Sequence, residues 1–213
     1  MRRGILALAI SGVIMWAEST VAQDQPRKVM IAPGLYSFVV DHQGDMVEIK
    51  RAQNPDSQVH RLYSGTARGM PQPIAPFRPH PVDTIAEREF ASYMMKAQRD
   101  DSIMIVDTRT EGWHARLTIP GAENMPYTLM DDPVSRQETL EEFGAELQDD
   151  GSYDFSSAAT LVMFCNGYWC AQTPTMVRAL LAQNYPAEKI KYYRGGMQAW
   201  TSLGFTVVGD AAN

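Results

Sequence analysis

The pattern of hydrophobic and polar positions divides the chain near residue 83. Before it, residues 36–40 and 46–50 alternate between apolar and polar side chains, with the polar segment Asp41–Asp45 between them. Such alternation around a turn predicts a β-hairpin. An isolated hairpin is marginal in water, so we expect this one to pack on the rest of the protein. Residues 71–81 contain five prolines, which predicts an extended connector without helix or central strand.

The segment after residue 83 alternates between strand and helix patterns. Short apolar runs predict buried strands, the most hydrophobic being 160–164. Apolar residues three and four apart predict helices, and Thr84 with Glu87 has capping-box spacing at the start of the first one. We expect strands at 102–106, 122–125, 160–164 and 189–193, and helices at 84–98, 135–147, 173–184 and 197–203. This order is typical of α/β proteins with a doubly wound parallel sheet and helices on both faces.

The N-terminus has the pattern of a secretory signal peptide. Arg2 and Arg3 precede the apolar stretch Gly4–Ala17, and the small residues of Thr20–Ala22 suit a signal peptidase. We therefore predict a signal peptide at 1–22, a periplasmic location and no membrane span after cleavage; an uncleaved membrane anchor is the alternative. The remaining chain divides into an N-terminal extension with hairpin and connector, 23–83, and an α/β domain, 84–213.

Composition excludes several classes of protein. Hydrophobic residues make up 45% and charged residues 21% of the 213 residues, which excludes wholesale disorder. The net charge of −6 argues against a nucleic-acid partner. Two cysteines exclude a disulfide-rich scaffold, and the four histidines lack metal-ligand spacing. We expect no metal site and no cofactor.

The segment with candidate chemistry directly follows the strand 160–164. Cys165 opens a short loop that reads Cys-Asn-Gly-Tyr-Trp-Cys and ends at Cys170, just before the helix predicted from Thr173. Parallel sheets bind ligands at the carboxyl ends of their strands. Backbone N–H groups of the turn and the helix N-terminus would form an anion cradle, which predicts a lowered pKa and a nucleophilic thiolate at Cys165. An inert buried cysteine is the alternative.

This loop and three other motifs together resemble the rhodanese family of sulfurtransferases. The motifs are Val106-Asp-Thr-Arg109, Ile119-Pro-Gly-Ala-Glu-Asn-Met-Pro126, and Arg194-Gly-Gly196 followed by Trp200. The resemblance covers residues 84–208. Within the family, the loop is similar to that of exported bacterial rhodanese-like proteins, which also carry an N-terminal extension. It implies a rhodanese-like doubly wound parallel sheet.

The resemblance also implies a reaction. Cys165 would take a sulfane sulfur from a small donor such as thiosulfate, hold it as a persulfide and pass it to a thiol or protein acceptor. Arg109 would lie near the substrate, although the residues alone equally favour Arg109 as a structural partner of Asp107. The resemblance further implies that the loop contacts substrate through Asn166, Gly167, Tyr168, Trp169 and Cys170.

Two other functions remain open from the sequence. The loop has no lysine or arginine, and its second cysteine favours a thiol-disulfide redox protein that uses Cys165 and Cys170 as partners. Their spacing is not the Cys-x-x-Cys of thioredoxin-like proteins. A non-catalytic binding module is the second alternative. A cysteine phosphatase is excluded, because Ala171 stands where its arginine is needed.

Overall fold

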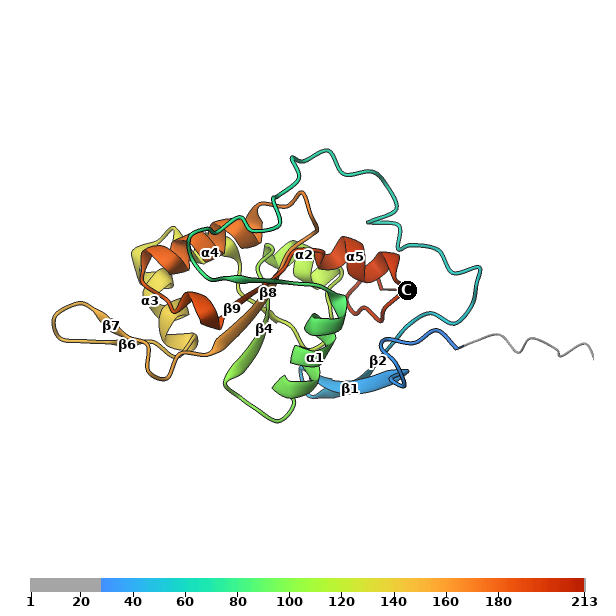
Figure 1. Cartoon of the computed structure of the whole chain (residues 1–213), viewed down its shortest axis with the longest axis horizontal. Coiled ribbons are helices and arrows are strands. Elements are labelled where there is room, and N and C mark those ends of the chain that lie inside the picture. Colours follow the sequence, from blue (N-terminus) through green and yellow to red (C-terminus); the bar gives the residue numbers. More distant parts are fainter. Residues whose placement is uncertain (1–27, 213) are drawn as a thin grey trace, which may run out of the picture.

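The computed structural model describes residues 28–212, so the predicted signal peptide at 1–22 lies outside the described residues. Its centre is a five-stranded sheet whose strands pair in parallel, in the order β3-β9-β8-β4-β5 (Figure 1). These strands are β3 (Asp83–Ile85), β4 (Ile103–Asp107), β5 (Glu123–Asn124), β8 (Thr160–Phe164) and β9 (Ile190–Tyr193). The doubly wound α/β fold predicted from the sequence is confirmed.

Helices cover both faces of the sheet. The helices are α1 (Glu87–Ala97), α2 (Glu111–Arg116), α3 (Pro133–Glu142), α4 (Gln172–Ala182) and α5 (Gly196–Ser202), with 3-10 turns η1 (Tyr127–Met130) and η2 (Ala187–Lys189). Side chains of α1 and α5 share one hydrophobic cluster with the hairpin, whereas those of α3 and α4 belong to a second cluster. Within residues 28–212, no helix combines the length and apolarity needed to cross a membrane.

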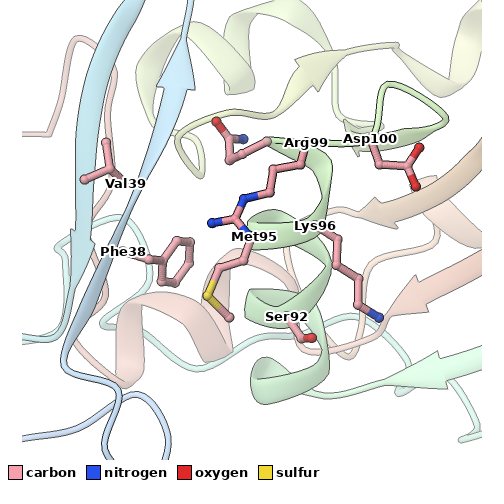
Figure 2. A pocket seen from close by; sticks show the side chains of 8 residues that line it. Phe38, Val39, Ser92, Met95, Lys96, Arg99 and Asp100 are labelled. Atoms are coloured by element: carbon pink, nitrogen blue, oxygen red, sulfur yellow. The ribbon is translucent and has the colours of Figure 1, made fainter.

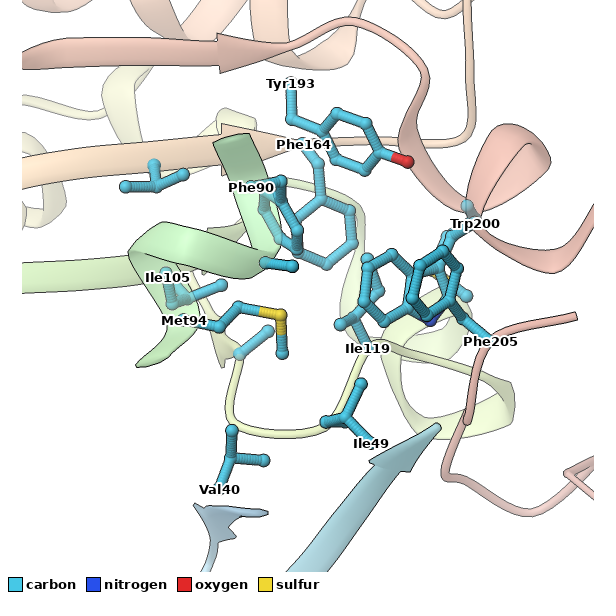
Figure 3. Packing of buried hydrophobic residues seen from close by; sticks show 14 of the residues in the cluster. Val40, Ile49, Phe90, Met94, Ile105, Ile119, Phe164, Tyr193, Trp200 and Phe205 are labelled. Carbon is cyan, nitrogen blue, oxygen red and sulfur yellow. The ribbon is translucent and has the colours of Figure 1, made fainter. Parts of the chain in front are cut away.

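The first cluster is built around Phe90 of α1 (Figure 3). Its ring stacks on Tyr193 at 4.4 Å and meets the rings of Phe164 and Trp200 edge-on, each at 5.7 Å. All four side chains are fully buried. Phe164 and Tyr193 are the last residues of β8 and β9. This packing therefore fixes the carboxyl ends of these strands, where the Cys165 loop begins.

The N-terminal extension joins the same cluster. Strands β1 (Ser37–His42) and β2 (Asp45–Lys50) pair antiparallel, and both residues of their connection, Gln43 and Gly44, have positive φ, as tight hairpin turns require. Val40 and Ile49 are fully buried against the domain. The predicted hairpin and its packing on the rest of the protein are confirmed. Residues 71–81 contain neither helix nor strand, as predicted, but they are not extended throughout, because residues 76–79 form a turn in which the His80 N–H donates to the Phe77 carbonyl at 2.9 Å.

Two predicted helices start or end elsewhere. Thr84 lies in β3 instead of capping a helix: its hydroxyl donates to the Ile74 carbonyl, and α1 begins at Glu87 without a side-chain cap. Helix α3 ends at Glu142, shortly before Gly144, whose φ of +80° suits a helix terminus. The stretch predicted as its last turn instead forms β6 (Glu146–Leu147), which pairs with β7 (Tyr153–Asp154). Helix α2 was not expected from the sequence.

Candidate active site

Cys165 lies at the carboxyl end of β8, the central strand of the sheet, as the sequence predicted. The loop that it opens ends at Cys170, and α4 begins two residues later at Gln172. Both cysteines are free, and only 2% of Cys165 and 4% of Cys170 is exposed. The burial means that any reaction at these thiols takes place largely out of water.

Helix α5 holds the first half of the loop. The backbone N–H groups of Met197 and Gln198 donate to the carbonyls of Cys165 and Asn166, at 3.0 and 2.9 Å. Gly196 makes this approach possible: its φ is +52°, and a Cβ there would lie 2.3 Å from the Cys165 carbonyl oxygen. The Arg194-Gly-Gly196 motif is therefore a packing requirement of the loop.

The two thiols interact with each other and with the start of α4. The Cys165 thiol donates toward the Cys170 carbonyl, with Sγ and O 3.6 Å apart, and also hydrogen-bonds the Cys170 side chain. Thr173 bonds Cys165 through its backbone N–H and hydroxyl, and the backbone N–H of Gln172 bonds Cys170. Asn166 Nδ2 lies 3.8 Å from Cys170 Sγ. These groups form a cradle for one negative charge.

The charge rests mainly on the second cysteine. Burial raises the pKa of the Cys165 thiol well above its usual range, more than its bonds with Thr173 lower it. The hydrogen bond from Cys165 lowers the pKa of Cys170 to about 6, supported by backbone N–H groups of Gln172 and Asn166. The sequence-based prediction of a lowered pKa at Cys165 was therefore wrong, because it counted the cradle and omitted the cost of burying the thiolate.

Arg109 is fully buried beside the loop and forms an ion pair with Asp107. Its Nε and Nη2 donate to the two oxygens of Asp107 at 2.9 and 2.6 Å, and Nη2 also donates to the Leu117 carbonyl. Burial alone would raise the pKa of Asp107, but hydrogen bonds from Arg109 and His114 outweigh it and lower that pKa. These contacts match the structural interpretation of Arg109; its substrate role stays a prediction.

Tyr63, from the N-terminal extension, completes the network. Its hydroxyl donates to Asn166 Oδ1 at 2.7 Å and accepts from Arg109 Nη1 at 3.0 Å. The side chain is 8% exposed, and burial raises its pKa to about 12, so the hydroxyl stays protonated at neutral pH. The sequence analysis missed Tyr63. Residues 51–70 show no hydrophobic period, so no local signal marked this residue.

Comparison with known families decides the class of protein. The Rhodanese-like domain model matches residues 90–203. The chain belongs to the rhodanese-like domain family. No curated protein matches it.

Several solved structures are similar to this rhodanese-like domain. The BH2092 protein of Bacillus halodurans has a TM-score of 0.44 and 16% identity, over 60% of this chain and 77% of its own. The rhodanese-like domain of the Alr3790 protein from Anabaena has a TM-score of 0.38 and 20% identity, over 61% of this chain and 79% of its own. The single-domain sulfurtransferase RDL2 of Saccharomyces cerevisiae has a TM-score of 0.39 and 16% identity, over 60% of this chain and 95% of its own. The family assignment itself rests on the match over residues 90–203.

Residues 68–74, which lead into the proline-rich connector and are here called the strap, pack on the rhodanese-like loop at Tyr168 and Trp169. The Gln72 N–H donates to the Tyr168 carbonyl at 2.7 Å, and Arg194 donates to the Gln72 carbonyl through Nε and Nη2 at 3.0 and 2.6 Å. Gly69 packs so closely on Trp169 that a Cβ would lie 2.9 Å from the Trp169 carbonyl oxygen. The extension thus forms one wall around the cysteine pair.

Arg194 also brings positive charge to a loop that has none in its own sequence. Its guanidinium lies over the Tyr168 ring, 5.1 Å from the ring centre. Tyr168 is 39% exposed, and the indole of Trp169 donates to Gln198 Oε1 at 3.1 Å. Gly167 packs against the same Gln198, whose Cβ would be 2.9 Å from an added Cβ. Two arginines therefore lie beside the predicted loop residues: Arg194 over Tyr168, and Arg109, whose Nη1 is 3.5 Å from Asn166 Oδ1.

Other hollows of the rhodanese-like chain lie away from the cysteines. A groove of about 560 Å³ runs between β1 and α1 (Figure 2). Its lining residues are Phe38, Val39, Ser92, Met95, Lys96, Gln98, Arg99 and Asp100. None of them belongs to the loop or bonds to it. Among residues 28–212, no three His, Cys, Asp or Glu side chains are placed to hold a metal ion.

Proposed function

We propose that this rhodanese-like protein is an exported sulfurtransferase. It takes a sulfane sulfur from a small donor such as thiosulfate, holds it as a persulfide on Cys165, and transfers it to a thiol or protein acceptor. The observation that carries the proposal is a free cysteine at the carboxyl end of β8, bonded to the first turn of α4, within a rhodanese-like domain.

The first half-reaction needs the thiolate on Cys165. The cysteine pair shares a hydrogen bond, and its charge rests on Cys170. Transfer of the shared proton to Cys170 leaves the thiolate on Cys165. That thiolate attacks the outer sulfur of thiosulfate, a Cys165 S–S bond forms, and the donor's S–S bond breaks. Sulfite departs with the electron pair of that bond.

The second half-reaction returns the enzyme to its starting state. The acceptor's nucleophile attacks the outer sulfur of the persulfide, and the Cys165 thiolate leaves. The bond from the Thr173 N–H favours negative charge at Cys165, whether that charge is on a thiolate or a persulfide. The positive charge of Arg194, which lies over the Tyr168 ring, attracts an anionic sulfur donor to the loop.

Export is proposed from the sequence pattern at 1–22, and with it a periplasmic location. Expression of the full chain in a bacterial host, followed by fractionation and N-terminal sequencing, tests this. We expect a periplasmic product that begins at Gln23. A product that retains Met1 in the membrane fraction would support the uncleaved anchor instead.

Thiocyanate formation from thiosulfate and cyanide tests the chemistry. Cys165→Ser should abolish it, while circular dichroism shows an unchanged fold. The matched variant Cys170→Ser removes the proton acceptor and keeps the nucleophile. It should slow thiocyanate formation without abolishing it, which distinguishes the two roles. Full activity in Cys165→Ser would exclude Cys165 as the sulfur carrier. Absence of thiocyanate formation in the wild-type protein would instead favour a non-catalytic binding module.

A further inference from the structure

We propose that Cys170 resolves the Cys165 persulfide within the loop. The sulfane sulfur leaves as hydrosulfide, and a Cys165–Cys170 disulfide remains, which a dithiol reductant reopens. This inference rests on the proposed function, since it needs a persulfide on Cys165. It adds an activity, reduction of a sulfane sulfur to sulfide, to the transfer of that sulfur to an outside acceptor.

The loop geometry brings the two cysteines together. The Cys170 N–H donates to the Gly167 carbonyl at 2.9 Å, which folds the second half of the loop back on the first. The Cys165 Sγ lies 3.6 Å from the Cys170 carbonyl oxygen and hydrogen-bonds the Cys170 side chain. A disulfide needs the two sulfur atoms at about 2.05 Å. The Cys165 sulfur already contacts the backbone of Cys170, so rotation of the two side chains is the movement that this bond requires.

Cys170 is also prepared to act as a nucleophile. Its Sγ receives the Asn166 amide at 3.8 Å and the backbone N–H of Gln172, both of which favour a thiolate, whereas the protonated thiol donates to Gln172 Oε1 at 3.4 Å. The hydrogen bond from Cys165 is the largest cause that lowers the pKa of Cys170 to about 6. At neutral pH the pair therefore carries one thiolate, on Cys170. The transfer reaction uses this thiolate only to take the proton from Cys165. Once Cys170 has passed that proton on to the persulfide, its thiolate is a nucleophile with no other assigned role.

Enclosure favours this partner over an outside acceptor. Cys165 is 2% exposed, and the strap is bonded to the loop through Gln72 and Tyr168. Arg194 fixes Gln72 from its other side. A protein thiol must displace the strap to reach the persulfide, whereas Cys170 is already inside. The intramolecular attack therefore avoids the cost of opening the site.

The step balances in atoms and electrons. The proton that Cys170 took in the first half-reaction passes to the anionic persulfide, which gives Cys165–S–SH and a Cys170 thiolate. This thiolate attacks the Sγ of Cys165–S–SH, and a Cys165–Cys170 S–S bond forms. The bond between Sγ and the outer sulfur breaks, and the outer sulfur leaves as HS⁻ with the electron pair. The sulfane sulfur gains two electrons, which the two cysteine thiols lose on forming the disulfide. A dithiol then reduces this disulfide by exchange and restores both thiols.

A single-turnover experiment on the full chain without its signal peptide tests the proposal. The protein is reduced, freed of reductant, mixed with thiosulfate in the absence of oxygen, and sampled over time. Intact mass reports the state of the cysteines, and separate assays measure sulfite and sulfide. We expect sulfite first with a species about 32 Da heavier, then sulfide with a species about 2 Da lighter, each near one equivalent per chain.

The Cys170→Ser variant supplies the matched control, loaded with inorganic polysulfide so that its persulfide does not depend on thiosulfate chemistry. It should remain about 32 Da heavier and release no sulfide until a dithiol is added. Wild-type protein that stays in the heavier form without sulfide overturns the inference and leaves the proposed function intact. Absence of both sulfite and the heavier species in wild type overturns the proposed function, and this inference with it.

Discussion

The hydroxyl of Tyr63 donates a 2.7 Å hydrogen bond to the side chain of Asn166, and so ties the N-terminal extension to the loop between the two cysteines. The two residues are 103 positions apart in the sequence. Arg109 donates to the same hydroxyl, so one buried tyrosine connects the loop with the Asp107–Arg109 ion pair. The extension is therefore part of the site's construction.

The Tyr63→Phe variant tests this connection. Removal of the hydroxyl leaves Asn166 Oδ1 and Arg109 Nη1 with only the long 3.5 Å contact between them, which costs about 1–3 kcal/mol of unfolding free energy. We expect urea unfolding to show this loss, together with a lower kcat for thiocyanate formation because the loop is less well held. Tyr36→Phe, at a half-exposed tyrosine of the same extension, should change neither quantity. Equal effects of the two variants would contradict the role of Tyr63.

The Arg109→Ala variant separates the two interpretations of that residue. It leaves Asp107 buried without its ion-pair partner, and breaking such a pair costs about 3–5 kcal/mol. Thermal and urea unfolding should show a large loss of stability, against a change within about 0.5 kcal/mol for the exposed control Arg61→Ala. Unchanged stability with a raised KM for thiosulfate would instead establish the substrate role.

The same ion pair predicts how stability depends on pH. The folded pKa of Asp107 lies below its usual value of 3.8. The carboxylate therefore contributes stability that is fully present above the unfolded pKa and is lost as pH falls through the lower folded pKa. We expect the melting temperature of wild type to fall below about pH 4. In Asp107→Asn the melting temperature should depend less on pH below about pH 4. If that dependence is unchanged, other carboxylates cause the loss of stability in acid.

Alkylation of the cysteine pair by iodoacetamide should follow an unusually acidic titration. The pKa of Cys170 is about 6, so the rate should rise with pH around that value and level off above it. An ordinary cysteine reacts with a midpoint near about 8.5. In the Cys170→Ser variant the remaining thiol is Cys165, whose pKa burial raises, so the midpoint should move well above neutral pH. A wild-type midpoint near that of a free cysteine would contradict the shared charge.

The Arg194→Ala variant should open the strap. It removes two hydrogen bonds to the Gln72 carbonyl and the cation over Tyr168. Hydrogen bonds from a charged donor are worth about 1.5 kcal/mol or more, so alkylation at a fixed pH should accelerate about tenfold with little change in melting temperature. Lys96→Ala, at a lysine that lies over Tyr93, is the control and should leave the rate unchanged. Equal rates in all three proteins would show that the strap does not limit access.

Sequence patterns alone were enough for strands β4, β5, β8 and β9 of the sheet, though not for the edge strand β3, and for the place of the cysteine loop. The apolar run Thr160–Phe164, the helix pattern that follows Pro174 and the alternation of 36–40 are local features, and each became the expected element. Hydrophobic periodicity reports which side of a short segment is buried, and this information is carried by neighbouring residues. The order of the four rhodanese motifs is local information of the same kind.

Tertiary structure alone decided how the site is enclosed and charged. Thr84 became a strand residue because β9 offered it a parallel partner, a contact between residues more than a hundred positions apart. Tyr63 and the strap reached the loop through contacts that no local pattern encodes. The lowered pKa falls on Cys170 while burial raises that of Cys165. The pKa of a buried group depends on the solvent it loses and the partners it gains, and both are set only when distant segments pack together.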